Sequence, residues 1–254
     1  MYNKSSQMNK RQQKIFKMLE KNFEVKIADL SEHFGVTEMT IRRDLEKMEK
    51  MGLLKRTFGG AILVVKEDTI RLRNSIHYEE KVRIGKKAAE LIRDGESIFI
   101  DGGSTTLQIA RHLSPSKQIT VVTNALNVAA ELLDKGVTTL LTGGILMNST
   151  ASMVGPIAYA TLSTMAFDRA FLGASGVSDV HGYSNSNNYE TEIKKLVISC
   201  ANEVNIVVDH SKFGVKSLFS FADLSQADRI ITDAMPAESL QFACSESNVL
   251  IEIA

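Results

Sequence analysis

Two adjacent arginines, Arg42 and Arg43, lie in a stretch whose apolar residues repeat with the period of a helix. Ile41, Leu45 and Met48 are spaced i, i+4, i+7, which predicts a helix that buries them in a small core. Successive residues turn by about 100° around a helix, so Arg43 should lie on the outer face and Arg42 on its flank. Because arginine can donate two hydrogen bonds to a guanine edge, we expect this face to bind DNA. The other residues predicted to point outward are Met39, Thr40, Lys47 and Lys50.

The residues before this helix predict the rest of a helix-turn-helix. The apolar residues of a first helix are Ile15, Met18, Leu19 and Phe23, and those of a second, which begins near Lys26, are Ile27, Leu30 and Phe34. Gly35 can adopt a positive φ and end the second helix, and Thr37 can cap the third. Such a pair of helices fits a major groove about 12 Å wide. A three-helix protein-interaction module would share the apolar spacing, but it has no need of the paired arginines.

A β-hairpin is predicted after Gly52. Residues 53–57 and 61–64 are rich in strand-forming residues and flank a Phe-Gly-Gly turn at 58–60. This hairpin would be a wing that places Lys55 and Arg56 beside phosphates. The predicted DNA-binding residues are Thr37, Met39, Thr40, Arg42, Arg43, Lys47, Lys55 and Arg56.

A second candidate site begins with Gly-Gly-Ser-Thr-Thr at residues 102–106. Ser104, Thr105 and Thr106 open a predicted helix that ends near Leu113, so their N–H groups and hydroxyls would face an anion at the positive end of that helix. The glycines would let the ligand approach the backbone. The segment therefore predicts a phosphate site, although a simple turn and helix cap would have the same residues.

Short β-rich runs alternate with helical segments from residue 97 onward. The runs are 97–100, 119–122, 138–141, 169–172, 204–208, 229–231 and 249–253. Such alternation predicts an α/β domain with a mostly parallel sheet covered by helices. In open sheets of this kind, ligands bind beyond the carboxyl ends of the strands.

Polar residues follow several of these strands or lie near their ends. Lys212 offers a compact cation. Hydrogen-bonding groups of the kind that read sugar hydroxyls are offered by Asp101, Asn124, Glu190 and Asp209. Glu190 and Lys194 are also spaced i, i+4, so a surface ion pair worth about 0.2–0.5 kcal/mol is the alternative for Glu190.

The charge is distributed unevenly along the chain. Its 254 residues have a net charge of zero, yet residues 1–60 carry 13 Lys and Arg against 8 Asp and Glu, while the remainder carries 17 against 22. A basic head on an acidic body favours a polyanion-binding unit at the N-terminus. A solvated basic helix face would give the same imbalance.

Composition also excludes several classes of protein. No stretch approaches the roughly 18 apolar residues of a membrane span, and residues 1–21 are too polar for a secretory signal, so we expect a cytoplasmic protein. The two cysteines stand far apart and the histidines are scattered, which argues against a metal site. No Gly-x-Gly-x-x-Gly or Walker sequence is present, so we expect no cofactor. The predicted domains are 1–64, a winged helix-turn-helix, a linker at 65–80, and 81–254, a sensor domain.

Four segments near the N-terminus resemble the DNA-binding unit of the DeoR/GlpR family of bacterial regulators. They are Leu-Ser-Glu-His-Phe-Gly-Val at 30–36, Thr-Ile-Arg-Arg-Asp-Leu at 40–45, Met-Gly-Leu-Leu-Lys-Arg at 51–56 and Gly-Gly-Ala at 59–61. The chain departs from that family at Thr37, where Ser is common, and at Phe58, where His would be expected in the wing.

The resemblance extends through the larger domain. The similar segments are 81–92, 101–106, 122–124, 143–144, 154–156, 171–176, 189–194, 209–213 and 230–233. It implies a sensor with the fold of ribose-5-phosphate isomerase. By position, phosphate would be held by Ser104, Thr105 and Thr106, and the sugar would be surrounded by Asp101, Thr123, Asn124, Glu190 and Lys212. The full predicted effector set adds Gly103, Gly144, Gly173 and Asp209.

The resemblance implies a homo-oligomeric repressor of a carbohydrate-utilisation operon that is released from operator DNA by a phosphorylated sugar. The sequence leaves open an activator of the same type. It also leaves open an enzyme, a sugar-phosphate isomerase with a DNA-binding appendage, in which Asp101, Glu190 and Lys212 would supply a base and an electrophile. The identity of the sugar, the operon and the choice between dimer and tetramer are not predicted.

Overall fold

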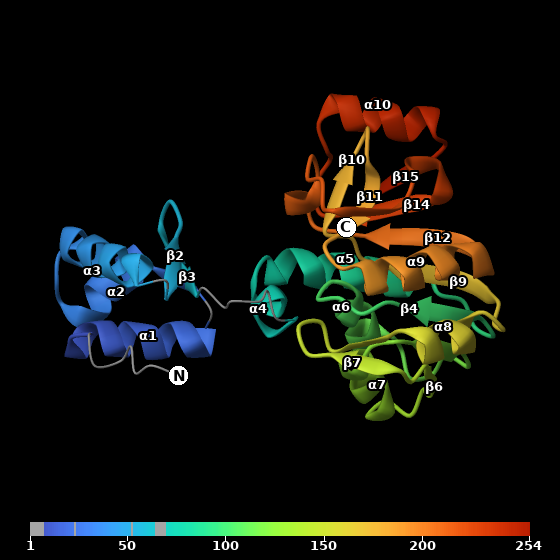
Figure 1. The fold of residues 1–254 in the computed structure, drawn as a ribbon, viewed down its shortest axis with the longest axis horizontal. Helices are drawn as coiled ribbons and strands as arrows, with labels where there is room; N and C mark the ends of the chain where they lie inside the picture. The colour runs from blue at the N-terminus through green and yellow to red at the C-terminus, as the bar shows by residue number, and fades with distance from the viewer. Residues whose placement is uncertain (1–7, 23, 52, 64–69) are drawn as a thin grey trace. The chain divides into compact units, whose positions relative to one another are not determined.

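The computed structural model describes residues 8–22, 24–51, 53–63 and 70–254. The chain divides into two compact units, Met1–Ile76 and His77–Ala254. Among the described residues, the first contains four helices and a small sheet, and the second is an α/β unit (Figure 1). No helix in the described part of the chain has the length and apolarity needed to cross a membrane.

The N-terminal unit is a winged helix-turn-helix. Its elements are α1 (Lys10–Asn22), β1 (Glu24–Lys26), α2 (Ile27–Phe34), α3 (Glu38–Lys50), β2 (Leu54–Arg56) and β3 (Gly60–Leu63). The strands form an antiparallel sheet in the order β1-β3-β2, and β1 is a strand that the sequence pattern did not predict. Gly35 follows α2 in the left-handed conformation, φ 61°, as its position predicted. The predictions for Phe23, Gly52 and residue 64 lie outside the described residues.

The core of this unit consists mainly of apolar residues predicted from helical spacing, joined by Leu54 and Ala61 of the hairpin, whereas Met18 and Phe34 are only partly buried. The fully buried members are Ile15, Leu19, Leu30, Ile41, Leu45, Met48, Leu54 and Ala61. Asp44 of α3 is also buried, and its carboxylate accepts hydrogen bonds from Arg11 Nε at 2.6 Å and Gln12 Nε2 at 2.8 Å in α1. These bonds fix the rotation of α3 against α1 and so determine which face of α3 is exposed.

The C-terminal unit is built on a seven-stranded parallel sheet in the order β15-β14-β12-β9-β4-β5-β6. The strands are β4 (Ser97–Ile100), β5 (Thr120–Thr123), β6 (Thr138–Leu141), β9 (Phe167–Leu172), β12 (Ala201–Val207), β14 (Arg229–Thr232) and β15 (Leu250–Ile253). Each coincides with a predicted strand, which confirms the α/β prediction, although β9 and β12 begin earlier than expected.

Helices cover both faces of this sheet (Figure 1). They are α5 (Tyr78–Leu91), α6 (Thr106–His112), α7 (Leu126–Leu133), α8 (Pro156–Leu162), α9 (Asn188–Cys200) and α10 (Glu238–Glu246). Ile98 and Ile100 pack in one core cluster with residues of α5, α6 and α7, whereas Phe99 packs in the other with residues of α8, α9 and α10. Alternate side chains of β4 therefore point to opposite layers, as a strand buried on both faces requires.

Several short elements were not predicted from the sequence. They are the hairpin of β7 (Ile145–Met147) and β8 (Ser152–Val154), the antiparallel sheet of β10 (Gly176–Ser178), β11 (Gly182–Asn185) and β13 (Phe219–Ala222), the 3-10 turn His210–Lys212, and α4 (Ile70–Ser75). The strands have only three or four residues, which is too short for an alternating pattern to stand out.

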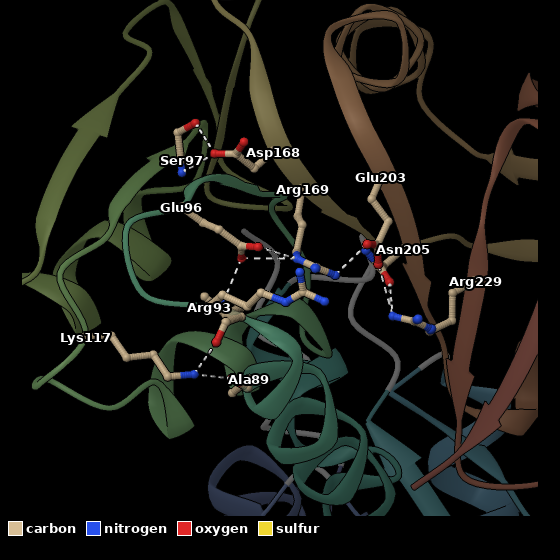
Figure 2. Close-up of polar contacts among 11 residues, drawn as sticks. Ala89, Arg93, Glu96, Ser97, Lys117, Asp168, Arg169, Glu203, Asn205 and Arg229 are labelled. Atoms are coloured by element: carbon tan, nitrogen blue, oxygen red, sulfur yellow. Dashed lines mark hydrogen bonds and ion pairs between the residues drawn. The ribbon is translucent and has the colours of Figure 1, made fainter.

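An ion-pair network lies near the amino-terminal ends of the strands, on the side of the sheet away from their carboxyl ends (Figure 2). Arg169 of β9 is buried, and its guanidinium donates to Glu96 at 2.9 Å and to Glu203 at 2.6 Å. Arg229 donates to the other oxygen of Glu203 at 3.0 Å and lies 3.1 Å from Glu252. The network therefore connects β4, β9, β12, β14 and β15 across the sheet.

We expect Arg169→Met to destabilise the C-terminal unit by about 2 kcal/mol. The loss of a buried partner usually costs about 3–5 kcal/mol, but Glu96 and Glu203 are partly exposed and Arg229 remains beside Glu203. Urea denaturation measures the effect. Lys195→Met is the matched control, because its ion pair with Glu192 is half-exposed on both sides and should contribute little. Equal losses in the two variants would contradict a structural role for the network.

Candidate functional site

The outer face of α3 begins at a capped N-terminus. Thr37 is the N-cap, and its hydroxyl oxygen accepts from the Thr40 backbone N–H at 3.4 Å. The hydroxyls of these two threonines also lie 3.0 Å apart. The cap holds the first turn of α3 in shape, so the residues that follow project from a fixed backbone.

Most side chains on α3 that periodicity predicts to point outward are exposed, whereas Thr40 is half-buried. Met39 has 59% of its surface exposed, and Arg43 and Lys47, one turn apart, are also exposed. Arg42 is exposed but forms an i, i+4 ion pair with Glu38 at 3.1 Å. The side chains of Arg43 and Lys47 have no ion-pair or hydrogen-bond partner within the part of the chain that the structure describes. They are therefore available to an anionic partner.

The wing is attached to α3 by Arg56. Its Nε and its backbone N–H both donate to Glu49 at 2.8 Å, and these hydrogen bonds hold the pKa of the Glu49 carboxyl below its usual value. Lys55 is exposed and Phe58 at the tip is fully exposed. Gly60 starts β3 where a Cβ would lie 1.9 Å from the Val25 carbonyl oxygen, so only glycine permits the pairing of β1 with β3.

In the larger unit, the ends of β4 and β9 meet around a buried ion pair. Asp101, which follows β4, accepts from the Gly173 backbone N–H at 3.1 Å. Lys194 of α9 binds the same carboxylate and donates to the Gly173 carbonyl at 2.8 Å. Burial raises the pKa of Asp101, while Lys194 opposes that rise. Lys194 was not among the predicted site residues.

Glu190 lies next to this pair and is also buried. Its carboxylate accepts from Ser152 Oγ at 3.0 Å and from Asn185 Nδ2 at 2.9 Å. The alternative of a surface ion pair between Glu190 and Lys194 is therefore wrong: both side chains are buried, and each has other partners.

The predicted phosphate loop lies against the same cluster. A Cβ on Gly102 would come within 2.9 Å of Ser152 Cβ, which places the loop beside the residue that donates to Glu190. Thr106 is fully buried, and its hydroxyl donates to the Gly103 carbonyl at 3.1 Å. The hydroxyls of Ser104 and Thr105, by contrast, have no hydrogen-bond partner among the described residues.

Two residues follow β5. Thr123 is fully buried, donates to the Ile100 carbonyl at 2.6 Å and accepts from the Ala125 N–H at 3.0 Å. Asn124 donates to the Met153 carbonyl at 3.2 Å, and its buried Oδ1 has no partner within the described part of the chain. Asn124 therefore retains an unused acceptor, whereas the Thr123 hydroxyl is already engaged.

A second buried acid, Asp209, follows β12. Its Oδ1 accepts from the Ser211 N–H at 3.1 Å and also binds the Ser211 hydroxyl, and its Oδ2 lies 3.9 Å from Lys81 Nζ. Burial raises the pKa of Asp209, but Ser211, Lys212 and Lys81 outweigh that effect and leave it lowered. The carboxylate therefore stays ionised. Lys81 was not predicted as a site residue.

The structure thus sorts the predicted effector residues into groups. Asp101 contacts Gly173 directly. The predicted phosphate loop, residues 102–106, lies near Glu190 because Gly102 packs against Ser152, which donates to Glu190. Asp209 and Lys212 lie two strands away from β4, beyond β9. Gly144 is exposed and has a φ of 114°. A Cβ there would lie 2.6 Å from the Val154 carbonyl oxygen, so the fold itself requires glycine at this position. No cluster of residues suited to bind a metal occurs in the described ranges.

Two family models match this chain. Residues 11–67 match the DeoR-like helix-turn-helix domain, and residues 76–234 match the DeoR C terminal sensor domain. Together these ranges include all the predicted site residues.

Curated relatives align with nearly the whole chain. The uncharacterized HTH-type transcriptional regulator YulB of Bacillus subtilis is 36% identical over 88% of each chain. The glycerol-3-phosphate regulon repressor of Escherichia coli is 32% identical over 94% of this chain and 96% of its own length. The putative aga operon transcriptional repressor of Escherichia coli O157:H7 is 33% identical over 92% of this chain and 89% of its own.

Solved structures with similar folds are more distant. Ribose 5-phosphate isomerase A from Methanocaldococcus jannaschii is 20% identical and covers 54% of this chain and 55% of its own, with a TM-score of 0.41. The eIF2B delta subunit from Chaetomium thermophilum is 16% identical and covers 61% of this chain and 57% of its own, with a TM-score of 0.46. Identities of this size say nothing about activity.

Proposed function

Because the chain belongs to the DeoR family of helix-turn-helix transcriptional regulators, we propose that it represses a carbohydrate-utilisation operon and leaves its operator when a phosphorylated sugar binds the C-terminal unit. The observation that carries this proposal is the outer face of α3, where Arg43 and Lys47 are exposed and have no partner among the described residues, while the opposite face of the helix packs in the core. Such a regulator acts on chromosomal DNA, so we also propose a cytoplasmic location.

The proposed DNA contacts fall into two classes. Arg43 and Lys47 face the major groove from α3, and Lys55 lies beside a phosphate from the wing. Arg56 orients the wing through Glu49, and Arg42 reaches DNA only if it leaves Glu38. Two copies of the chain would place two such helices in repeated half-sites, as helix-turn-helix regulators usually do.

The proposed effector site lies at the carboxyl ends of β4, β5, β9 and β12. Ser104 and Thr105, whose hydroxyls have no partner within the described ranges, offer them to a phosphate, while Thr106 contributes its backbone N–H because its hydroxyl is engaged. Asn124 Oδ1 and Asp209 Oδ2, two buried acceptors without hydrogen-bond donors among the described residues, favour a ligand rich in hydroxyl groups. Lys212 would add a cation.

The test of this function is the selection of binding sites from a random pool of duplex DNA by the full chain. We expect enrichment of a repeated half-site. If no sequence is enriched at low salt, the proposal that the chain binds operator DNA is contradicted.

A second candidate, a sugar-phosphate isomerase, is favoured by one observation: Asp101, Glu190 and Lys194 form a buried acid and base cluster. We propose that this cluster binds rather than catalyses. Interconversion of aldose and ketose phosphates by the purified chain, abolished in Glu190→Ala, would support the isomerase instead.

We also propose a route by which ligand occupancy reaches the DNA-binding unit. His77, the N-cap of α5, lies within the predicted linker, residues 65–80, and its ring lies 4.8 Å from the ring of His210. His210 is held in turn by Asp233, 2.6 Å from its Nδ1, and lies beside Asp209 in the proposed site. A ligand that moves this turn would therefore move the start of α5.

We expect His77→Asn to reduce the effect of the ligand on operator affinity at least about threefold, since coupling energies of this kind are about 1–3 kcal/mol. Asparagine tolerates the left-handed backbone of His77, φ 52°, but removes the ring contact. Operator and effector affinities measured separately should change less than about twofold. Tyr78→Ala, the exposed neighbour, is the control. Unchanged coupling in His77→Asn would exclude this route.

A further inference from the structure

One long stretch of the chain carries no charge. From Gly136 to Phe167 there is no Asp, Glu, Lys, Arg or His, although 60 of the 254 residues in the chain are Asp, Glu, Lys or Arg. The stretch forms β6, the β7–β8 hairpin and α8 (Figure 1). The stretch is therefore a continuous piece of the fold at one edge of the sheet. Its lack of charge is unusual there, because edge strands commonly carry charged side chains.

Large apolar side chains are exposed on these elements. They are Leu140 and Leu141 of β6, Ile145 and Leu146 of β7, and Ile157 and Tyr159 of α8, here called the uncharged face. Contacts show that the three elements adjoin. A Cβ on Gly143 would meet Ile157 at 3.8 Å, one on Gly155 would meet Ile145 at 3.3 Å, and Thr161 of α8 donates to the Thr142 carbonyl at 3.1 Å.

The strand beside this face is also unprotected. β6 is the last strand of the sheet, and in the described residues only β5 pairs with it. Edge strands are usually shielded by lysine, proline or a bulge, but β6 reads Thr-Thr-Leu-Leu. Apolar surface beside an open strand edge marks an interaction site.

We propose that the uncharged face binds the same face of a second copy of this chain across a twofold axis. A face without charge meets itself without repulsion, and interface centres are depleted of charged residues. A twofold interface also requires a patch that is complementary to itself, which an open strand edge provides when two copies of β6 run antiparallel. Nucleic acid and anionic membranes are poor occupants, because both are bound through cations.

This dimer deepens the proposed function, since it would present two α3 helices to DNA. The contacts proposed to form the dimer do not themselves require DNA. The test is sedimentation of the full chain and of Ile157→Glu, whose side chain is 65% exposed and can change without loss of core packing. We expect a wild-type dimer at micromolar concentration and a dimer dissociation constant at least about 30-fold higher in the variant.

Phe242→Glu is the matched control, because Phe242 is 69% exposed on α10, which packs beside the opposite edge strand, β15. It should leave the dimer intact. Ile145→Glu, on β7, provides an independent second variant if Ile157→Glu fails to fold. A monomeric wild-type chain, or a dimer that resists the charge at both Ile157 and Ile145, would overturn the proposal.

DNA binding separates this proposal from the proposed function. Ile157→Glu should bind DNA with a single half-site as tightly as wild type does. It should lose only the increase in affinity that wild type shows when the DNA carries a second half-site. If the wild-type chain dimerises through this face and yet binds no DNA, the interface stands and the proposed function fails.

Discussion

Arg43→Ala is expected to weaken operator binding by about 1–3 kcal/mol, or roughly 5- to 150-fold, the range for loss of a bidentate contact to guanine. Arg43 is exposed on α3 and has no partner among the described residues, so its removal breaks nothing within the protein. The affinity should fall mainly for the selected operator and much less for unrelated DNA. Fluorescence anisotropy with a labelled operator, at one fixed salt concentration, measures both.

Lys14→Ala is the control for this prediction. Lys14 is an exposed cation on α1, outside the predicted DNA-binding residues, and its loss removes the same charge from the same unit. We expect its effect to be equal on operator and unrelated DNA. If Arg43→Ala behaves like Lys14→Ala, Arg43 contributes charge and does not read bases.

The second large effect is expected at the effector site. Lys212→Ala should weaken the binding of a phosphorylated sugar about 10-fold or more, because a hydrogen bond to a charged group contributes about 1.5–3 kcal/mol. Lys212 is half-buried in the turn after β12, close enough to Asp209 to lower the pKa of that carboxyl. Operator affinity without the sugar should stay at the wild-type value. Calorimetry measures the binding of the sugar.

Lys216→Ala is the matched control for Lys212→Ala, since Lys216 is an exposed lysine four residues further along the same loop. It should bind the sugar like wild type. Equal losses in the two variants would indicate general electrostatic attraction, and no loss in Lys212→Ala would remove Lys212 from the site.

Periodicity was sufficient to predict the main elements. In α3, Ile41, Leu45 and Met48 set the rotation of the helix, and the structure places Arg43 and Lys47 on the side that this rotation predicts. All seven strands of the parallel sheet were predicted because short β-rich runs alternate with helical segments, and the inner strands β4 and β5 are apolar runs whose side chains are mostly buried.

What sequence could not predict depends on contacts between distant residues. Lys194 binds Asp101 across 93 positions in the chain, and no local pattern reports that contact. The i, i+4 spacing left a surface ion pair with Lys194 open as the alternative for Glu190, yet both side chains are buried. Lys81 was missed for the same reason, since the Asp209 carboxylate that it pairs with lies 128 positions further along the chain.

The most direct test of the account is the operator dissociation constant of the full chain, measured with triose, pentose and hexose phosphates and with the corresponding unphosphorylated sugars. Ligand coupling of about 1–3 kcal/mol predicts that one phosphorylated sugar raises this constant about 5- to 150-fold while its unphosphorylated form does not. A chain that binds its operator equally tightly in the presence of every phosphorylated sugar, although one of them raises its melting temperature, would contradict the central claim.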